Sequence, residues 1–213
     1  MKMTKRIILI FLFFGLVNQA RAQDSVQVTT FNNLEEASKD PEKVIRLDLS
    51  NQKLDFSKGV LKKFKNLEYL SLKNDHLSQL PEEIMELENL RILDLSGNDF
   101  SELPQNFFYL NNLEELYLND EKNLNLSETI SQLSLLPHLK ILHLENDRIK
   151  ELPENITQLK HLEYLYLNEN ELKQIPNSVL RMKQLKFLDI HHNSISPSIQ
   201  QNYNPNGNMI IKF

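Results

Sequence analysis

The chain has no cysteine among its 213 residues. It therefore has no disulfide bonds, no metal site built on thiolates, no catalytic thiol and no cysteine for lipid attachment. Exported animal proteins commonly depend on disulfides, so a cysteine-free chain that carries an export signal favours a bacterial envelope or exported protein.

A long apolar run is also lacking beyond the N-terminus. Residues 7–17 form an apolar run of 11 residues, about half of the ~20 that a membrane-spanning helix needs. Basic residues precede this run and a small-x-small site at 20–22 follows it, so we predict a signal peptide over 1–22 that is cleaved before Gln23. An uncleaved anchor is the alternative. After cleavage the chain is expected to be secreted, periplasmic or in the cell envelope, without stable membrane insertion.

Several functional signatures are missing too. The sequence contains no phosphate-binding glycine loop, no Gly-x-Ser-x-Gly elbow and no His-Glu-x-x-His motif, which are common marks of nucleotide-binding proteins and hydrolases. The formal net charge is −5, and no extended basic stripe is present. Nucleic acid is therefore not an expected partner, and we predict a protein that is not an enzyme and needs no cofactor.

What the chain does contain is one apolar phrase that occurs seven times, as in LRILDLSGNDF from Leu90. Positions one, four, six and eleven of the phrase are apolar. Five of the six start-to-start steps are 23 residues and the fourth is 26, so one repeat carries a three-residue insertion. Such regularity is typical of a repeat architecture. The repeats start at Val44, Leu67, Leu90, Leu113, Leu139, Leu162 and Leu185.

Each repeat has two halves with different periodicity. The alternation at Leu93-Asp94-Leu95 predicts a β-strand. The half that begins with Leu80-Pro81 has apolar residues spaced by four and then three, which indicates a helical turn that starts at proline; Glu83 is expected at its surface. A strand on one side and a bulkier turn on the other predict an α/β solenoid with its parallel sheet on the concave side and short helices or helical turns on the convex side.

These motifs resemble the leucine-rich repeat family. The second half, LPxxIxxLxxL, is similar to the 23-residue class found in Ras-suppressor-like and plant intracellular resistance proteins. The resemblance covers 44 to about 195 and implies a curved solenoid used for protein–protein recognition, without a particular partner. The Leu113 repeat departs from the pattern, and the tail 196–213 matches no repeat. The proline motif occurs at Leu80-Pro81, Leu103-Pro104, Leu152-Pro153 and Ile175-Pro176.

The ends of the chain are predicted to cap the open ends of the repeat core. A short edge strand at 26–30 and one or two helical turns over 33–39, capped by Asn32 or Asn33 and ended by Asp40-Pro41, precede the first repeat. In the tail, a turn at 204–207 is expected to lead into a last strand. The predicted divisions are a signal peptide at 1–22, an N-terminal cap at 23–43, seven leucine-rich repeats at 44–195 and a C-terminal cap at 196–213.

Position nine of each repeat is expected to turn inward and hydrogen-bond the loops of neighbouring repeats. An amide can both donate and accept there, whereas an ionised carboxylate only accepts. The asparagines should therefore be fully satisfied, and the repeats with Asp75 and Asp147 should be locally weaker. In the repeat with the insertion, apolar residues between 126 and 133 predict a longer convex helix. Position nine is occupied by Gln52, Asp75, Asn98, Glu121, Asp147, Asn170 and Asn193.

Positions three, five and seven should face outward on the concave sheet. Four adjacent strands there carry a cluster of aromatic and apolar residues, with Glu115, Glu145 and Glu169 expected as an acidic rim. Aromatic anchors ringed by polar groups are typical of binding hot spots, and the rim favours a partner with some positive charge. The alternative is that these residues only pair across strands. The predicted ligand-binding residues are Tyr117, Ile141, His143, Tyr164, Tyr166 and Phe187.

We therefore predict an exported, non-catalytic protein–protein interaction module that binds a protein or peptide on its concave sheet. The alternative is a structural or glycan-associated envelope protein. A metal site at His143, His191 and His192 is not predicted, because neighbouring residues of an extended chain point to opposite faces and no thiolate is available.

Overall fold

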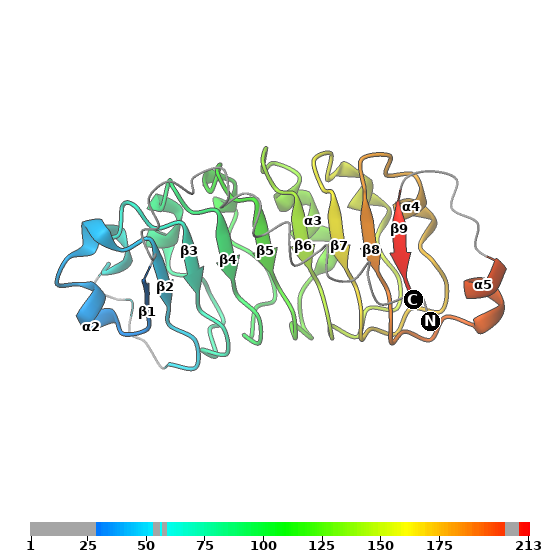
Figure 1. Cartoon of the computed structure of the whole chain (residues 1–213), viewed down its shortest axis with the longest axis horizontal. Helices are drawn as coiled ribbons and strands as arrows, with labels where there is room; N and C mark the ends of the chain where they lie inside the picture. The colour runs from blue at the N-terminus through cyan, green and yellow to red at the C-terminus, as the bar shows by residue number, and fades with distance from the viewer. Residues whose placement is uncertain (1–28, 53–55, 57–58, 203–208) are drawn as a thin grey trace, which may run out of the picture.

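The computed structural model describes residues 29–52, 56, 59–202 and 209–213, and the side chains of 200–202 are outside that description. The predicted signal peptide, most of the predicted edge strand and the predicted turn at 204–207 lie outside the described residues. The described part of the chain forms a curved solenoid with one open sheet (Figure 1). This confirms the predicted fold class.

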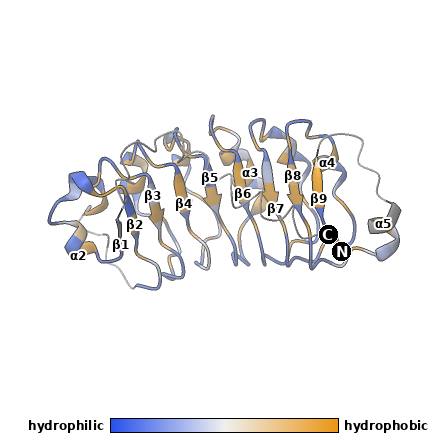
Figure 2. Ribbon diagram, viewed as in Figure 1, coloured by the Kyte–Doolittle hydropathy of each residue, from blue (hydrophilic) through white to orange (hydrophobic). Residues whose placement is uncertain are grey.

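All strands of this sheet are parallel, and their spatial order is the order of the sequence. The middle residue of each strand from β2 to β8 is a leucine without solvent exposure, such as Leu93 and Leu165. Figure 2 shows β4, β5 and β8 in the hydrophobic colour. The described strands are β1 (Thr30–Phe31), β2 (Arg46–Asp48), β3 (Tyr69–Ser71), β4 (Ile92–Asp94), β5 (Glu115–Tyr117), β6 (Ile141–His143), β7 (Tyr164–Tyr166), β8 (Phe187–Asp189) and β9 (Ile210–Lys212).

Short helical elements cover the convex side, as predicted. Most of them are 3₁₀ turns of three to five residues, the short length at which this helix type is usually found. The described elements are α2 (Leu34–Ala37), η1 (Pro41–Lys43), η2 (Leu61–Lys63), η3 (Glu82–Glu86), η4 (Phe107–Tyr109), α3 (Leu126–Leu133), η5 (Glu154–Gln158), α4 (Asn177–Leu180) and α5 (Pro197–Asn202). None of these described helices is long and apolar enough to cross a membrane.

The insertion in the Leu113 repeat is absorbed on the convex side. Helix α3 buries Ile130 and Leu133 against the core, and the Asn125 side chain accepts a hydrogen bond from the Glu128 backbone N–H at its start. The predicted longer helix is confirmed. The strands on either side keep their register, with Leu116 opposite Leu142, so the extra residues do not disturb the concave face.

The two ends add strands to the repeat sheet. At the N-terminal end, β1 pairs with β2, and the Asn33 side chain accepts a hydrogen bond of 2.9 Å from the Glu36 backbone N–H at the start of α2. At the C-terminal end, β9 pairs with β8. The concave sheet therefore continues one strand beyond the last predicted repeat.

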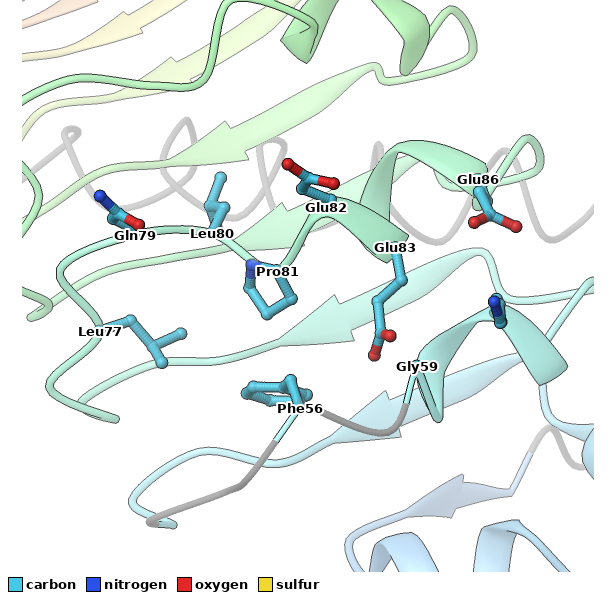
Figure 3. A pocket seen from close by; sticks show the side chains of 10 residues that line it. Phe56, Gly59, Leu77, Gln79, Leu80, Pro81, Glu82, Glu83 and Glu86 are labelled. Carbon is cyan, nitrogen blue, oxygen red and sulfur yellow. The ribbon is translucent and has the colours of Figure 1, made fainter.

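Glu83 on η3 is not the surface residue that the sequence suggested. Its side chain is only 8% exposed, and its Oε1 accepts a hydrogen bond of 3.0 Å from the Leu61 backbone N–H. It lines a groove of about 690 Å³ between η2 and η3, together with Phe56 and Pro81 (Figure 3). No site is assigned to this groove.

Candidate functional site: the concave aromatic surface

Three rings form a stack across the concave face of β5 to β7, and a fourth ring on β8 contacts the end of this stack. In a parallel sheet with aligned repeats, equivalent residues of neighbouring strands lie side by side, about 4.8 Å apart. Tyr117 lies opposite His143, and His143 lies opposite Tyr166. Their ring centroids are 3.8 Å and 4.3 Å apart, with interplanar angles of 11° and 4°. Phe187 lies opposite Tyr164 in the row beside this one, and its ring makes a tilted contact of 5.5 Å with Tyr166. We call these four residues the aromatic ladder.

Glu115 anchors the ladder from inside. The Tyr117 hydroxyl donates a hydrogen bond of 2.6 Å to Glu115 Oε1, and His143 Nε2 lies 3.0 Å from the same oxygen. Glu115 is only 4% exposed. The prediction that Glu115 belongs to an acidic rim is therefore wrong, because the larger side chains of the next strand and of its own strand cover the carboxylate.

His143 lies between two carboxylates. Its Nδ1 is 3.4 Å from Glu145 Oε2, while its Nε2 contacts Glu115. Desolvation lowers the pKa of His143, but the hydrogen bonds and negative charges of Glu115 and Glu145 outweigh it and raise the pKa above the ordinary value. The carboxylates thus favour a cationic imidazole between the two tyrosine rings.

The tyrosine hydroxyls stay protonated over a wide pH range. Burial raises the pKa of Tyr117, and the charge and hydrogen bond of Glu115 raise it further. Burial and the nearby charges of Glu115, Asp189 and Glu145 raise the pKa of Tyr166 to about 12. Both phenols therefore remain neutral hydrogen-bond donors at physiological pH.

The structure brings all six predicted ligand-binding residues onto one face. Tyr117, His143 and Tyr166 occupy one row, and Ile141, Tyr164 and Phe187 occupy the row beside it, from which Phe187 joins the aromatic ladder. His143 and Phe187 are buried, and the other four are half-buried. Half-buried rings that are held by their neighbours can serve as anchors for a partner.

Strand β9 contributes two residues that sequence reasoning missed. Ile210 lies opposite Phe187 and is 64% exposed, and Lys212 lies opposite Asp189 with its Nζ 2.9 Å from Asp189 Oδ2. The tail matched no repeat, so its register was not predictable from the spacing. The one available signal was the strand-like run at the end of the chain.

Glu169 does not flank the strands directly. It lies in the loop after β7, is exposed and has φ 60°. Its neighbours are His191 and His192, and the expectation that these two imidazoles point to opposite faces is wrong. His192 has φ 55°, so the chain turns at this point, and the two imidazole centroids lie 4.4 Å apart.

The first strands of the concave face have a different character. The Arg46 guanidinium lies 4.1 Å from the centroid of the Tyr69 ring. Asp48, Ser71 and Asp94 occupy the row that carries the aromatic ladder further along. The aromatic surface is therefore confined to the C-terminal part of the sheet.

A family model described as a leucine-rich repeat region matches residues 42–137 and 120–204. The chain belongs to the leucine-rich repeat family. No curated protein matches it at a significant level.

Solved structures of other leucine-rich repeat proteins have the same fold. A Leptospira interrogans leucine-rich repeat protein is 27% identical, with a TM-score of 0.56, over 86% of this chain and 57% of that protein. Human 5T4, the trophoblast glycoprotein, is 22% identical, with a TM-score of 0.64, over 80% of this chain and 69% of that one. Drosophila Toll, solved in complex with Spätzle, is 22% identical, with a TM-score of 0.58, over 81% of this chain and 23% of Toll. The chain therefore spans little more than half of the Leptospira protein and under a quarter of Toll.

Proposed function

We propose that this chain is a non-catalytic recognition module that binds a protein or peptide on its concave sheet. The contact residues would be Tyr117, Ile141, His143, Tyr164, Tyr166 and Phe187. The observation that supports this most directly is the aromatic ladder, in which the rings of Tyr117, His143 and Tyr166 stack in register across three strands and Phe187 on the fourth makes a tilted contact with Tyr166.

The ladder is suited to binding because its rings are already ordered. The stacked His143 ring and the hydrogen bond to Glu115 restrict the rotamer of Tyr117, while rings on both sides and the contact with Glu115 restrict that of His143. Binding of a partner therefore costs little conformational entropy in these side chains, and preorganised aromatic anchors are typical of interaction hot spots. The exposed side chain of Ile210 extends this apolar surface onto β9.

Similar solenoids support a binding role. Toll was solved with Spätzle, and a plant peptide hormone receptor, 22% identical with a TM-score of 0.52, was solved with RGF2. These two proteins carry a protein ligand and a peptide ligand on the same kind of scaffold. By analogy, we infer a polypeptide partner for this chain.

We also propose that the protein is exported to the periplasm, the cell envelope or the medium. The support comes from the signal-like residues 1–22. In this proposal 23–43 and 196–213 are caps around the repeats at 44–195, and the repeats belong to the 23-residue class.

The binding surface is tested by a double substitution with a matched control. Ligand is first captured from the native source with the purified chain, identified, and its affinity measured by calorimetry. Tyr164→Ala with Tyr166→Ala should weaken binding by about 100-fold, since each lost anchor removes about 1–2 kcal/mol or more. Tyr69→Ala, a half-buried tyrosine on β3, should leave affinity unchanged.

Circular dichroism and urea unfolding show whether each variant is folded. Unchanged affinity in a folded double variant would reject the aromatic surface. Retention on peptidoglycan or polysaccharide that is insensitive to both tyrosine changes would instead favour a glycan-associated envelope role.

A further inference from the structure

Two successive loops at the carboxyl ends of β7 and β8 bring three metal-ligating side chains together. One ligand atom from each of Glu169, His191 and His192 lies within 4.8 Å of the other two. His192 Nδ1 is 4.0 Å from Glu169 Oε1. The group lies outside the aromatic ladder.

The repeat geometry explains why these residues meet. Glu169 and His192 both occupy position eight of their repeats, where every repeat has a residue with positive φ, from 55° to 69°. This conformation turns the side chain out of the strand and stacks equivalent loops. The Glu169 backbone N–H donates a hydrogen bond of 3.1 Å to the His191 carbonyl, which joins the two loops. Earlier repeats have Asn51, Asn74, Gly97, Asp120 and Asn146 at this position.

His191 is oriented by a buried carboxylate. Its Nδ1 lies 2.5 Å from Asp189 Oδ1, and Asp189 is only 3% exposed. Asp189 is itself fixed by the His191 backbone N–H and by Lys212. A histidine whose one nitrogen is bound to a carboxylate presents the other nitrogen, here Nε2, in a fixed tautomer. This carboxylate–histidine arrangement is the usual outer shell of a metal-ligating histidine.

We propose that Glu169, His191 and His192 bind a divalent transition-metal ion, with Zn²⁺ as the reference ion. Two imidazoles and one carboxylate suit Zn²⁺, Cu²⁺ or Ni²⁺ and are poorly matched to Mg²⁺ or Ca²⁺, which prefer oxygen ligands. Ligand atoms around tetrahedral zinc are about 3.4 Å apart. Glu169 and His192 are both exposed, so rotation of their side chains closes the remaining distance and leaves a fourth position for water or a partner's ligand.

Calorimetric titration of the tag-free chain with zinc chloride tests the site. We expect one equivalent of zinc with saturable binding below about 1 mM. His192→Ala should weaken binding at least tenfold, and Glu169→Gln should weaken it by a smaller factor. Magnesium chloride should give no binding. No saturable zinc binding, or binding that survives His192→Ala unchanged, would overturn the proposal.

His76→Ala is the matched control. His76 is exposed, has φ 55° and lies 3.6 Å from the Asp99 carboxylate, but its loop supplies no second imidazole. It should not change zinc affinity. If His76→Ala weakened binding as much as His192→Ala, the metal would be held by scattered surface histidines and the proposal would be wrong.

Electron paramagnetic resonance of the Cu²⁺-loaded chain counts the imidazole ligands directly. Two coordinated nitrogens are expected for the unaltered chain and one for His192→Ala. A single coordinated nitrogen in the unaltered chain would rule out the paired histidines as ligands, whatever the zinc affinity.

Discussion

Asn170 and Asp147 occupy the same inward-facing position in neighbouring repeats, and their hydrogen bonding differs. The Asn170 amide donates to the Leu144 and Leu167 carbonyls at 2.7 Å and 3.1 Å, and its oxygen accepts from the Asp147 and Ile149 backbone N–H groups. Asp147 Oδ1 accepts from the Glu121 backbone N–H at 2.7 Å. Its Oδ2 is buried and has no hydrogen-bond partner among the described residues.

The difference shows that the repeat backbone keeps its conformation even where the side chain at this position makes fewer hydrogen bonds. Both side chains accept from the preceding loop, but only the amide also donates to the carbonyls beneath it. Burial raises the pKa of Asp147 to about 8 and that of Glu121 to about 7, with backbone hydrogen bonds opposing the shift and neighbouring carboxylates adding to it. A carboxyl group at this position has a hydrogen-bond donor only when it is protonated. The stability of the repeats that carry Asp147 and Glu121 therefore depends on pH.

The largest effect is expected from core substitutions, which test whether the repeats that carry Asp147 and Asn170 share one hydrophobic core. Leu165→Ala and Leu142→Ala each remove a side chain with no solvent exposure. Each should lower the free energy of unfolding by about 2–5 kcal/mol, because each leaves a cavity. Urea unfolding measures this, with the exposed Glu102→Ala as control. An equal loss for Glu102→Ala would show that the core is misplaced.

Loss of the amide should have a smaller effect. Asn170→Ala leaves two carbonyls and two backbone N–H groups without their partner, so we expect a loss of about 1–3 kcal/mol in the free energy of unfolding. Asp147→Ala should have a smaller effect at the same pH, since fewer bonds are removed. If Asp147→Ala were the more destabilising change, the comparison between the two repeats would fail.

The pH dependence of stability should come partly from the carboxyl repeats. The pKa values of Asp147 and Glu121 are higher in the folded chain than in the unfolded chain, where they are about 4. The folded state therefore binds more protons between pH 4 and 8, and this contribution to stability is complete below about pH 4 and lost as the pH rises to about 8. The urea midpoint should fall over that range. A urea midpoint that rises between pH 4 and 8 would contradict the raised pKa values of Asp147 and Glu121.

The smallest effect isolates Asp147. Asp147→Asn restores a donor where Oδ2 lies, so it should stabilise the chain by about 1 kcal/mol near pH 8 and by less near pH 5. It should also flatten the pH dependence of the urea midpoint relative to the unaltered chain. Glu102→Gln, at an exposed carboxyl, is the control and should change neither quantity.

Much of the fold was predictable from the sequence. Leu93 and Leu165 lie in the core because the strand alternation places them there, and Asn98 and Asn170 are satisfied because an amide both donates and accepts. The position of Glu115 was not predictable. Strand alternation assigns it to the concave face but does not show that Tyr117 and His143 cover it.

The sequence alone determined the solenoid, its parallel sheet and the strands that carry the aromatic residues, because these follow from local periodicity repeated along the chain. Only the tertiary structure decided which side chains share hydrogen bonds across repeats, where β9 adds Ile210 and Lys212, and how Glu169 meets His191 and His192. The reason is that these contacts depend on strand register and on positive-φ turns, which bring together residues about one repeat apart.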